Sequence, residues 1–161
     1  MELRLLFATP DTESLTLLES LLASALELTP MQVAVDHVDS MHELMARADR
    51  YADDTVLLDW PMAQAATPEL VKELLVHNPE LRIVALLPAG YRQYRQEVWR
   101  AGACTSIAKE NMEQEWLSSI LCVMHRSMVR EAKLHALYTV GATAAASMTT
   151  DVKESALCCN G

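Results

Sequence analysis

The chain has 161 residues, of which 51% are hydrophobic and 22% are charged, and this composition is typical of a folded globular domain. Its net charge of −9 comes from the first part of the chain. Residues 1–89 carry 5 basic and 15 acidic residues, whereas residues 90–161 carry 8 and 7. Nucleic-acid binding depends on dense lysine and arginine, so we expect a protein partner and no nucleic acid.

The sequence also indicates the compartment. No apolar run approaches the roughly 18 residues of a membrane span, and the N-terminus lacks the cationic start and cleavage site of a signal peptide. The cysteines form no disulfide framework, which favours reduced thiols: Cys104, Cys122, Cys158 and Cys159. We therefore expect a cytoplasmic protein with no membrane partner, and we assign no role to the cysteine pair in the tail.

Short apolar strands alternate with amphipathic helices along the first 125 residues. The predicted strands cover residues 3–8, 32–38, 55–59, 81–87 and 104–108. The predicted helices cover residues 12–28, 41–51, 67–78 and 91–102, and a long helix begins after residue 111. Parallel strands need crossover helices, so this order predicts an α/β fold of three layers, with a doubly wound, five-stranded parallel sheet in the middle.

The last predicted helix is longer than such a domain requires. Its first turns complete the core, and large apolar residues continue to position 140, interrupted by Glu131. A run of this kind needs cover, which predicts a helix for dimerisation or partner docking. We divide the chain into a domain of residues 1–125, a helical extension of residues 126–140 and a flexible tail of residues 141–161, which lacks large apolar residues over most of its length.

Polar residues stand at the carboxyl ends of the predicted strands, where folds of this kind have their working sites. Asp59 closes the third strand in "LLDWPM", and Lys109 follows the fifth in "SIAKE". No glycine-rich phosphate motif follows the first strand. A buried carboxylate needs a partner, so an Asp59–Lys109 ion pair without any chemistry is the simplest interpretation of these two residues.

This pattern resembles the receiver domain of two-component response regulators, and the "RAGA" turn makes it most similar to receivers of the LuxR type. The resemblance covers about residues 1–125 and implies a CheY-like, flavodoxin-like sheet with an extended last helix. It places the phosphoacceptor at Asp59 and the family's lysine at Lys109. LuxR-type receivers carry a helix-turn-helix output domain, which the 36 residues after position 125 are too short to supply.

Other positions depart from the family. The acid pair that holds Mg²⁺ falls on Ala8 and Thr9, and the switch hydroxyl falls on Leu87. The switch aromatic falls on Ser106 or Ile107, so it too is absent. Asp11 is a candidate substitute acid, although one carboxylate is weaker than a pair for a hard ion. The sequence therefore predicts a degenerate receiver with no catalytic residue, no metal site and no cofactor.

Three functions remain open on this basis. The first is a pseudo-receiver, not an enzyme, that acts in signal transduction by protein–protein contact and independently of Mg²⁺-dependent phosphorylation. The second is a single-domain response regulator that a histidine kinase phosphorylates on Asp59, with Mg²⁺ as cofactor. The third is a truncated transcription or antitermination regulator. The first two predict a protein partner, either a histidine kinase or another regulatory protein.

Candidate interface residues are aromatic or large and apolar. The resemblance implies pairing through the fourth-helix, fifth-strand and fifth-helix face, and a homodimer through that face and the last helix is expected. The side chain of Trp60 is either an interaction anchor or a cap over the pocket. Cys122 and His125 are too few ligands for a metal site. The interface candidates are Trp60, Tyr91, Tyr94, Trp99, Met128, Leu134, Leu137 and Tyr138.

Overall fold

The structure is a computed structural model that describes residues 2–49 and 55–154, with side chains described as far as residue 140. Within these residues, five parallel strands form one sheet in the order β2-β1-β3-β4-β5. This is the predicted doubly wound sheet. The strands are β1 (Leu3–Ala8), β2 (Val33–Val38), β3 (Thr55–Asp59), β4 (Arg82–Leu87) and β5 (Thr105–Ala108).

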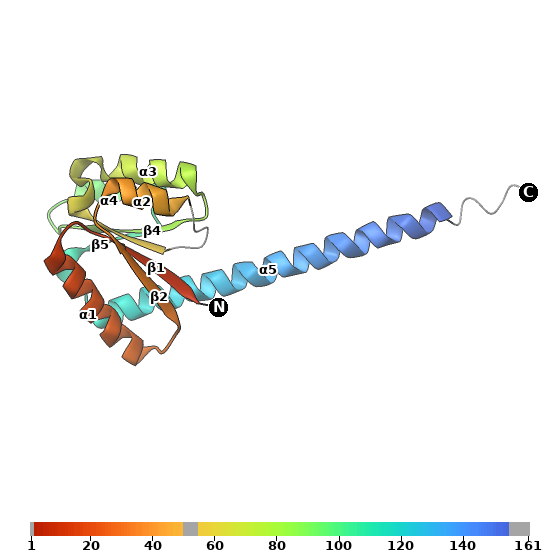
Figure 1. Cartoon of the computed structure of the whole chain (residues 1–161), viewed down its shortest axis with the longest axis horizontal. Coiled ribbons are helices and arrows are strands. Elements are labelled where there is room, and N and C mark those ends of the chain that lie inside the picture. The colour runs from red at the N-terminus through yellow and green to blue at the C-terminus, as the bar shows by residue number, and fades with distance from the viewer. Residues whose placement is uncertain (1, 50–54, 155–161) are drawn as a thin grey trace, which may run out of the picture. The chain divides into compact units, whose positions relative to one another are not determined.

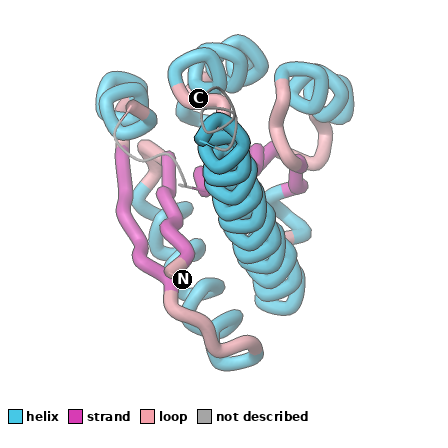
Figure 2. The backbone as a smooth tube through the Cα atoms, turned by 90° about the vertical axis from the view of Figure 1, so that its right-hand side faces the viewer, coloured by secondary structure: helices cyan, strands magenta, loops and turns pink. Residues whose placement is uncertain are grey.

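Helices cover both faces of the sheet, as Figures 1 and 2 show. α2, α3 and α4 lie on one face, and α1 and the start of α5 lie on the other. The four helices predicted before α5 are confirmed to within a few residues at their described ends, and residues 50 and 51 of the second one lie outside the described part of the chain. Their bounds are α1 (Thr12–Leu28), α2 (Met41–Ala48), α3 (Thr67–His77), α4 (Arg92–Ala101) and α5 (Gln114–Glu154).

The alternation of side chains along each strand divides the core into two halves. One half lies beneath α2, α3 and α4, where alternate residues of the three central strands meet apolar helix residues such as Leu44, Val71 and Val98. These strand residues are Leu6, Ala8, Val56, Leu58, Ile83, Ala85 and Leu87. The intervening strand residues, among them Phe7 and Leu57, are also buried, so both faces of the sheet are apolar.

The other half of the core involves α1 and the first turns of α5. Leu18, Leu22 and Ala25 form the buried face of α1, and Leu117 and Leu121 are buried on α5. At the end of α1, the hydroxyl groups of Thr29 and Ser118 lie 2.6 Å apart and join the two helices by a hydrogen bond. The covered sheet holds the strand ends, and therefore the site, in a fixed arrangement.

The "RAGA" turn between α4 and β5 requires its glycine. Gly102 adopts a φ of 111°, which β-carbon-bearing residues rarely adopt. Its backbone N–H donates to the carbonyl of Trp99, and a β-carbon at this position would lie 2.5 Å from Leu75 Cδ1. The turn ends α4 and sends the chain directly into β5, which places Lys109 at the carboxyl edge of the sheet.

α5 continues well beyond the predicted end of the helical extension. Its backbone is helical to Glu154, although the sequence predicted a helix to position 140 only. Alanine and other small residues are frequent after position 140, and alanine has the highest intrinsic helix propensity. The chain divides into two compact units, Met1–Leu121 and Cys122–Gly161. The flexible tail stays a prediction, and its residues 155–161 lie outside the described part of the chain.

In the described ranges, no helix combines the length and the apolar character that a membrane span requires.

Candidate functional site

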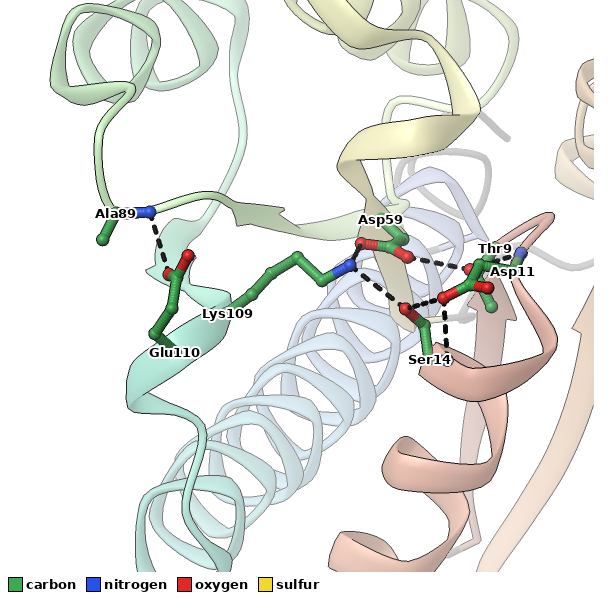
Figure 3. A network of polar contacts seen from close by, with 7 residues as sticks. All are labelled: Thr9, Asp11, Ser14, Asp59, Ala89, Lys109 and Glu110. Carbon is green, nitrogen blue, oxygen red and sulfur yellow. Dashed lines mark hydrogen bonds and ion pairs between the residues drawn. The ribbon is translucent and has the colours of Figure 1, made fainter.

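Asp59 lies at the centre of a polar network at the carboxyl edge of the sheet (Figure 3). Its side chain is fully buried. Thr9 Oγ1 donates a hydrogen bond of 2.8 Å to Oδ2, and Lys109 Nζ forms an ion pair of 2.8 Å with Oδ1. Both carboxylate oxygens therefore have a partner, and the predicted Asp59–Lys109 pair is present.

The parallel register explains why these residues meet. β1 and β3 are neighbours, with Ala8 opposite Leu58, so Thr9 and Asp59 follow at the same edge. β5 ends at Ala108 beside β4, and the next residue, Lys109, reaches back across β4 towards Asp59. The carboxyl ends of parallel strands share one edge, and this brings together residues that lie 50 positions apart in the sequence.

Thr9 is held rigidly in the place that the resemblance assigns to an acid. The backbone N–H of Thr9 donates to the carbonyl of Val38. The Nε2 atom of His37 lies 3.0 Å from the carbonyl oxygen of Thr9. Its hydroxyl oxygen also accepts a hydrogen bond of 3.2 Å from the N–H of Asp11. A carboxylate only accepts hydrogen bonds, so the proton of the Thr9 hydroxyl is directed at Asp59, and Thr9 acts as a donor to the buried carboxylate.

Ser14 belongs to the network, and sequence reasoning missed it. Lys109 Nζ donates to Ser14 Oγ at 3.1 Å, and Ser14 Oγ donates to Asp11 Oδ2 at 2.6 Å. The only available signal was the spacing of Asp11 and Ser14, which is that of a helix N-cap and its third residue. Nothing in the spacing of Ser14 and Lys109, 95 residues apart, indicates their contact.

Asp11, the candidate substitute acid, is the N-cap of α1. Its carboxylate accepts hydrogen bonds from both the hydroxyl and the backbone N–H of Ser14. The Ser14 hydroxyl is the main cause of a pKa below the ordinary value of 3.8 for this carboxyl group, and the Ser14 N–H adds to it. Asp11 is exposed, and among the described residues its carboxylate is linked to the pocket through Ser14, whereas none of its hydrogen bonds goes to Asp59.

The cap gives a pH-dependent contribution to stability. The folded-state pKa of Asp11 is lowered, so this contribution is complete above the unfolded pKa and is lost as the pH falls through the folded value. We expect Asp11→Ala to lower the melting temperature at neutral pH. Asp11→Asn should keep most of the cap, because asparagine caps as well as aspartate. Calorimetry below pH 3.8 should show the wild type and Asp11→Asn converging, and a constant difference would contradict this role.

The residues around Asp59 do not fit Mg²⁺. A hard divalent cation prefers several oxygen ligands with carboxylate charge. Ala8 and Leu87, at two of the degenerate positions, are buried in the apolar core beneath α2, α3 and α4. The described groups in contact with the carboxylate are a hydroxyl that donates to it and an ammonium group. No further carboxylate is bonded to Asp59 among the described residues, so these residues lack the carboxylate charge that a hard divalent cation prefers.

The loop between β4 and α4 is fastened to the site from two directions. Glu110, next to Lys109, accepts a hydrogen bond of 2.9 Å from the N–H of Ala89 (Figure 3). Trp60, next to Asp59, stacks on Tyr91 with ring centres 4.9 Å apart and planes inclined by 19°. Tyr94 packs edge-on against Trp60 at 4.9 Å. Leu87, at the position that the resemblance assigns to the switch hydroxyl, is the last residue of the strand before this loop.

The aromatic interface candidates fall into two groups. Trp60 and Tyr94 are half-buried and pack against the core, and Tyr91 retains 41% of its exposure. Trp99 is 66% exposed on α4. Together with Gln96 and Arg100, it lines a groove of about 330 Å³. The stacking on Tyr91 places Trp60 within an internal cluster, and Trp99 is the residue of this set that is most available to a partner.

The candidates on α5 also divide. Met128 retains 6% of its exposure, and its part in an interface stays a prediction. Leu134, Leu137 and Tyr138 are exposed and stay interface candidates.

Comparisons with known proteins agree with the geometry. The family model of the response regulator receiver domain matches residues 13–121. A search of curated proteins gave no significant match.

Solved receiver structures share the fold. One is the receiver domain of a sensor histidine kinase from Pseudomonas aeruginosa, whose structure has a magnesium ion in the active-site cleft. It is 20% identical to this chain, with a TM-score of 0.60, and the match covers 75% of this chain and 95% of that chain. A response regulator from Clostridium difficile is 15% identical, with 78% and 98% covered and a TM-score of 0.64. A CheY-like protein, tadZ, from Pseudomonas aeruginosa is 23% identical, with 76% and 98% covered and a TM-score of 0.56.

Identities this low show the fold alone, whereas the family model covers more than half of the chain. The five-stranded sheet and the Asp59–Lys109 pair at its carboxyl edge agree with that match. The chain belongs to the response regulator receiver domain family, and its role lies in signalling.

Proposed function

We propose that this chain is a pseudo-receiver, which acts in cytoplasmic signal transduction through protein–protein contact, without enzymatic activity and without Mg²⁺-dependent phosphorylation. The observation that carries the proposal is the hydrogen bond of 2.8 Å from Thr9 Oγ1 to Asp59 Oδ2. A hydroxyl occupies the place of an acid, so the pocket lacks the charge that would attract a divalent cation.

The charges of the pocket support the same conclusion. Asp59 and Lys109 neutralise one another at 2.8 Å, and the Thr9 hydroxyl adds no charge. Transfer of a phosphoryl group places additional negative charge on the acceptor site, and metal ions and donors must stabilise that charge. Here the Lys109 ammonium already bonds Asp59 and Ser14, so it is not free to compensate for a missing cation.

The exposed surface of α4 is suited to a protein partner. Arg92, Arg95 and Arg100 are exposed on this helix together with Trp99, and arginine and tryptophan are enriched at the energetic centres of interfaces. The first 89 residues have a net charge of −10, from 5 basic and 15 acidic residues, so this basic helix contrasts with the rest of the domain. The homodimer expected from the sequence, through the α4 face and the last helix, stays a prediction.

The test is exposure of the full chain to acetyl phosphate and to beryllofluoride, each with millimolar MgCl₂. Intact mass spectrometry measures phosphorylation, and thermal unfolding measures beryllofluoride binding. We expect no added phosphoryl mass and no shift in melting temperature, in the wild type and in Asp59→Asn alike. A mass increase in the wild type that disappears in Asp59→Asn would overturn the proposal.

The second candidate is a single-domain response regulator phosphorylated on Asp59 by a histidine kinase. The Asp59–Lys109 pair favours it, because both residues stand where the family's acceptor and lysine stand. The experiment above separates the two candidates, since only this one predicts an acid-labile phosphoryl group on Asp59. The third reading, a nucleic-acid regulator, would require binding to a nucleic-acid probe that weakens steeply as salt is raised.

A further inference from the structure

The part of α5 that follows the receiver unit has an exposed apolar stripe. Val123, Leu134, Leu137 and Tyr138 are 67%, 45%, 70% and 78% exposed. At 3.6 residues per turn, they fall within an arc of about 100° around the helix. This stripe is distinct from the buried face of the same helix, to which Met124 and Met128 belong. We call it the extension stripe, and its width is that of a helix face that packs against another helix.

Basic residues run through and beside the extension stripe. Arg130 lies inside the arc, and Arg126 and Lys133 flank the stripe on one side. A groove of about 370 Å³ lies beside the stripe. It is lined by the side chains of His125, Arg126, Val129, Arg130 and Lys133. Within the described residues, the three basic side chains form no ion pair. Their charge is therefore available to a partner.

Acidic residues are nearly absent from the same segment. Residues 122–140 contain three basic residues and one acid, Glu131. Glu131 lies at the edge of the arc, on the side opposite Arg126 and Lys133, and it accepts a hydrogen bond of 3.2 Å from Ser127. The stripe thus offers positive charge along one flank and no negative charge within it.

This charge pattern argues against a second copy of the helix as the occupant. In a parallel pair, Arg130 would meet Arg130 within the seam, and although Arg126 of each helix would face Glu131 of the other, Arg130 and Lys133 would have no acidic counterpart in residues 122–140. In an antiparallel pair, no acid of the stripe would face Arg126, Arg130 or Lys133. Like charges in register weaken helix pairing and direct it towards partners of opposite charge.

We propose that the extension stripe docks an acidic amphipathic helix of another protein. Apolar side chains of that helix, spaced by three and four residues, would cover Leu134, Leu137 and Tyr138. Glutamate or aspartate residues on its flank would pair with Arg126, Arg130 and Lys133. The inference rests on the proposed function as a protein-binding receiver and names the partner chemistry of one surface.

Two synthetic helical peptides test this partner chemistry on the full chain. Both carry the same leucine and isoleucine seam, and one has glutamate and the other lysine at every flanking position. Isothermal titration calorimetry should show the glutamate peptide binding at least about tenfold more tightly, with an advantage that decreases as salt is raised. The triple variant Arg126→Glu, Arg130→Glu and Lys133→Glu should reverse the preference.

A control reverses a charge outside both proposed binding surfaces. Lys72→Glu, at an exposed position of α3, should leave the binding of the peptides unchanged. Equal binding of the two peptides, or no binding of either, would overturn the inference. So would binding of a duplex DNA probe to the three basic residues without binding of the glutamate peptide.

Self-association of the stripe is tested separately. Leu137→Asp, at a 70% exposed position, should leave the oligomeric state of the full chain unchanged in sedimentation analysis. Loss of a dimer in this variant would assign the stripe to a second copy and overturn the inference. The peptide results do not depend on Asp59. Phosphorylation of Asp59 would therefore refute the proposed function and leave the peptide experiment to be judged by itself.

Discussion

Replacing Lys109 by methionine is expected to lower the free energy of unfolding by about 2–3 kcal/mol, measured by urea unfolding at neutral pH. Asp59 is fully buried, and Lys109 is its ion-pair partner at 2.8 Å. Removal of the ammonium group leaves a buried carboxylate whose charge is no longer compensated. Breaking a buried pair usually costs more, but the Lys109 side chain is 28% exposed and water can partly replace it.

The complementary change should cost less. Asp59→Asn keeps an oxygen that accepts from Thr9, and Lys109 can turn towards solvent, so we expect a loss of about 1 kcal/mol. The double variant Asp59→Asn, Lys109→Met should be more stable than Lys109→Met alone, because it removes the uncompensated charge. A double-mutant cycle measures this coupling. Equal losses in the two single variants would show that the charge of Asp59 is not what Lys109 stabilises.

Thr9→Asp is the second large effect, and it should make the stability of the chain depend on Mg²⁺. A carboxylate at this position would lie against Asp59 Oδ2, which the Thr9 hydroxyl now approaches to 2.8 Å. Two buried like charges repel, so we expect a loss of about 2–4 kcal/mol in EDTA. Binding of Mg²⁺ to the variant at saturating concentration should raise its free energy of unfolding again by about 1–3 kcal/mol.

The wild type and Thr9→Asn are the controls. Thr9→Asn is neutral and similar in size to the aspartate variant, so its stability should be the same in EDTA and in millimolar MgCl₂. The stability of the wild type should also be the same in EDTA and in millimolar MgCl₂, because a hydroxyl that donates to Asp59 supplies no charge for the ion. Stabilisation of the wild type by Mg²⁺ to the extent expected for Thr9→Asp would contradict our account of the pocket.

The polar network compensates the charges of Asp59 and Lys109 within the described residues. The pair joins the ends of β3 and β5, and the hydroxyl groups of Thr9 and Ser14 connect it to β1 and α1. Each buried charge is thereby compensated, which is the condition for retaining it in an apolar fold. The loop before α4 is fastened to the same strand ends through Glu110 and Trp60.

Local patterns determined the secondary structure and the family of this chain. The strands Leu3–Ala8 and Thr55–Asp59 and the helix Thr12–Leu28 have the predicted bounds, because buried strands and amphipathic helices leave short-range periodicities in the sequence. The end of α5 could not be predicted in this way. The prediction followed large apolar residues, whereas a helical backbone needs only residues of sufficient propensity, such as the alanines after position 140.

The candidate site was predictable only in part. The positions of Asp59 and Lys109 followed from the rule that parallel strands end at one edge, and their pairing followed from the cost of a buried charge. The sequence by itself thus determined which strand ends meet and which family they indicate. Only the tertiary structure decided that Thr9 donates to Asp59 and that Ser14 holds Lys109. Each of these depends on the direction of a side chain, which packing between distant segments sets and local periodicity does not encode.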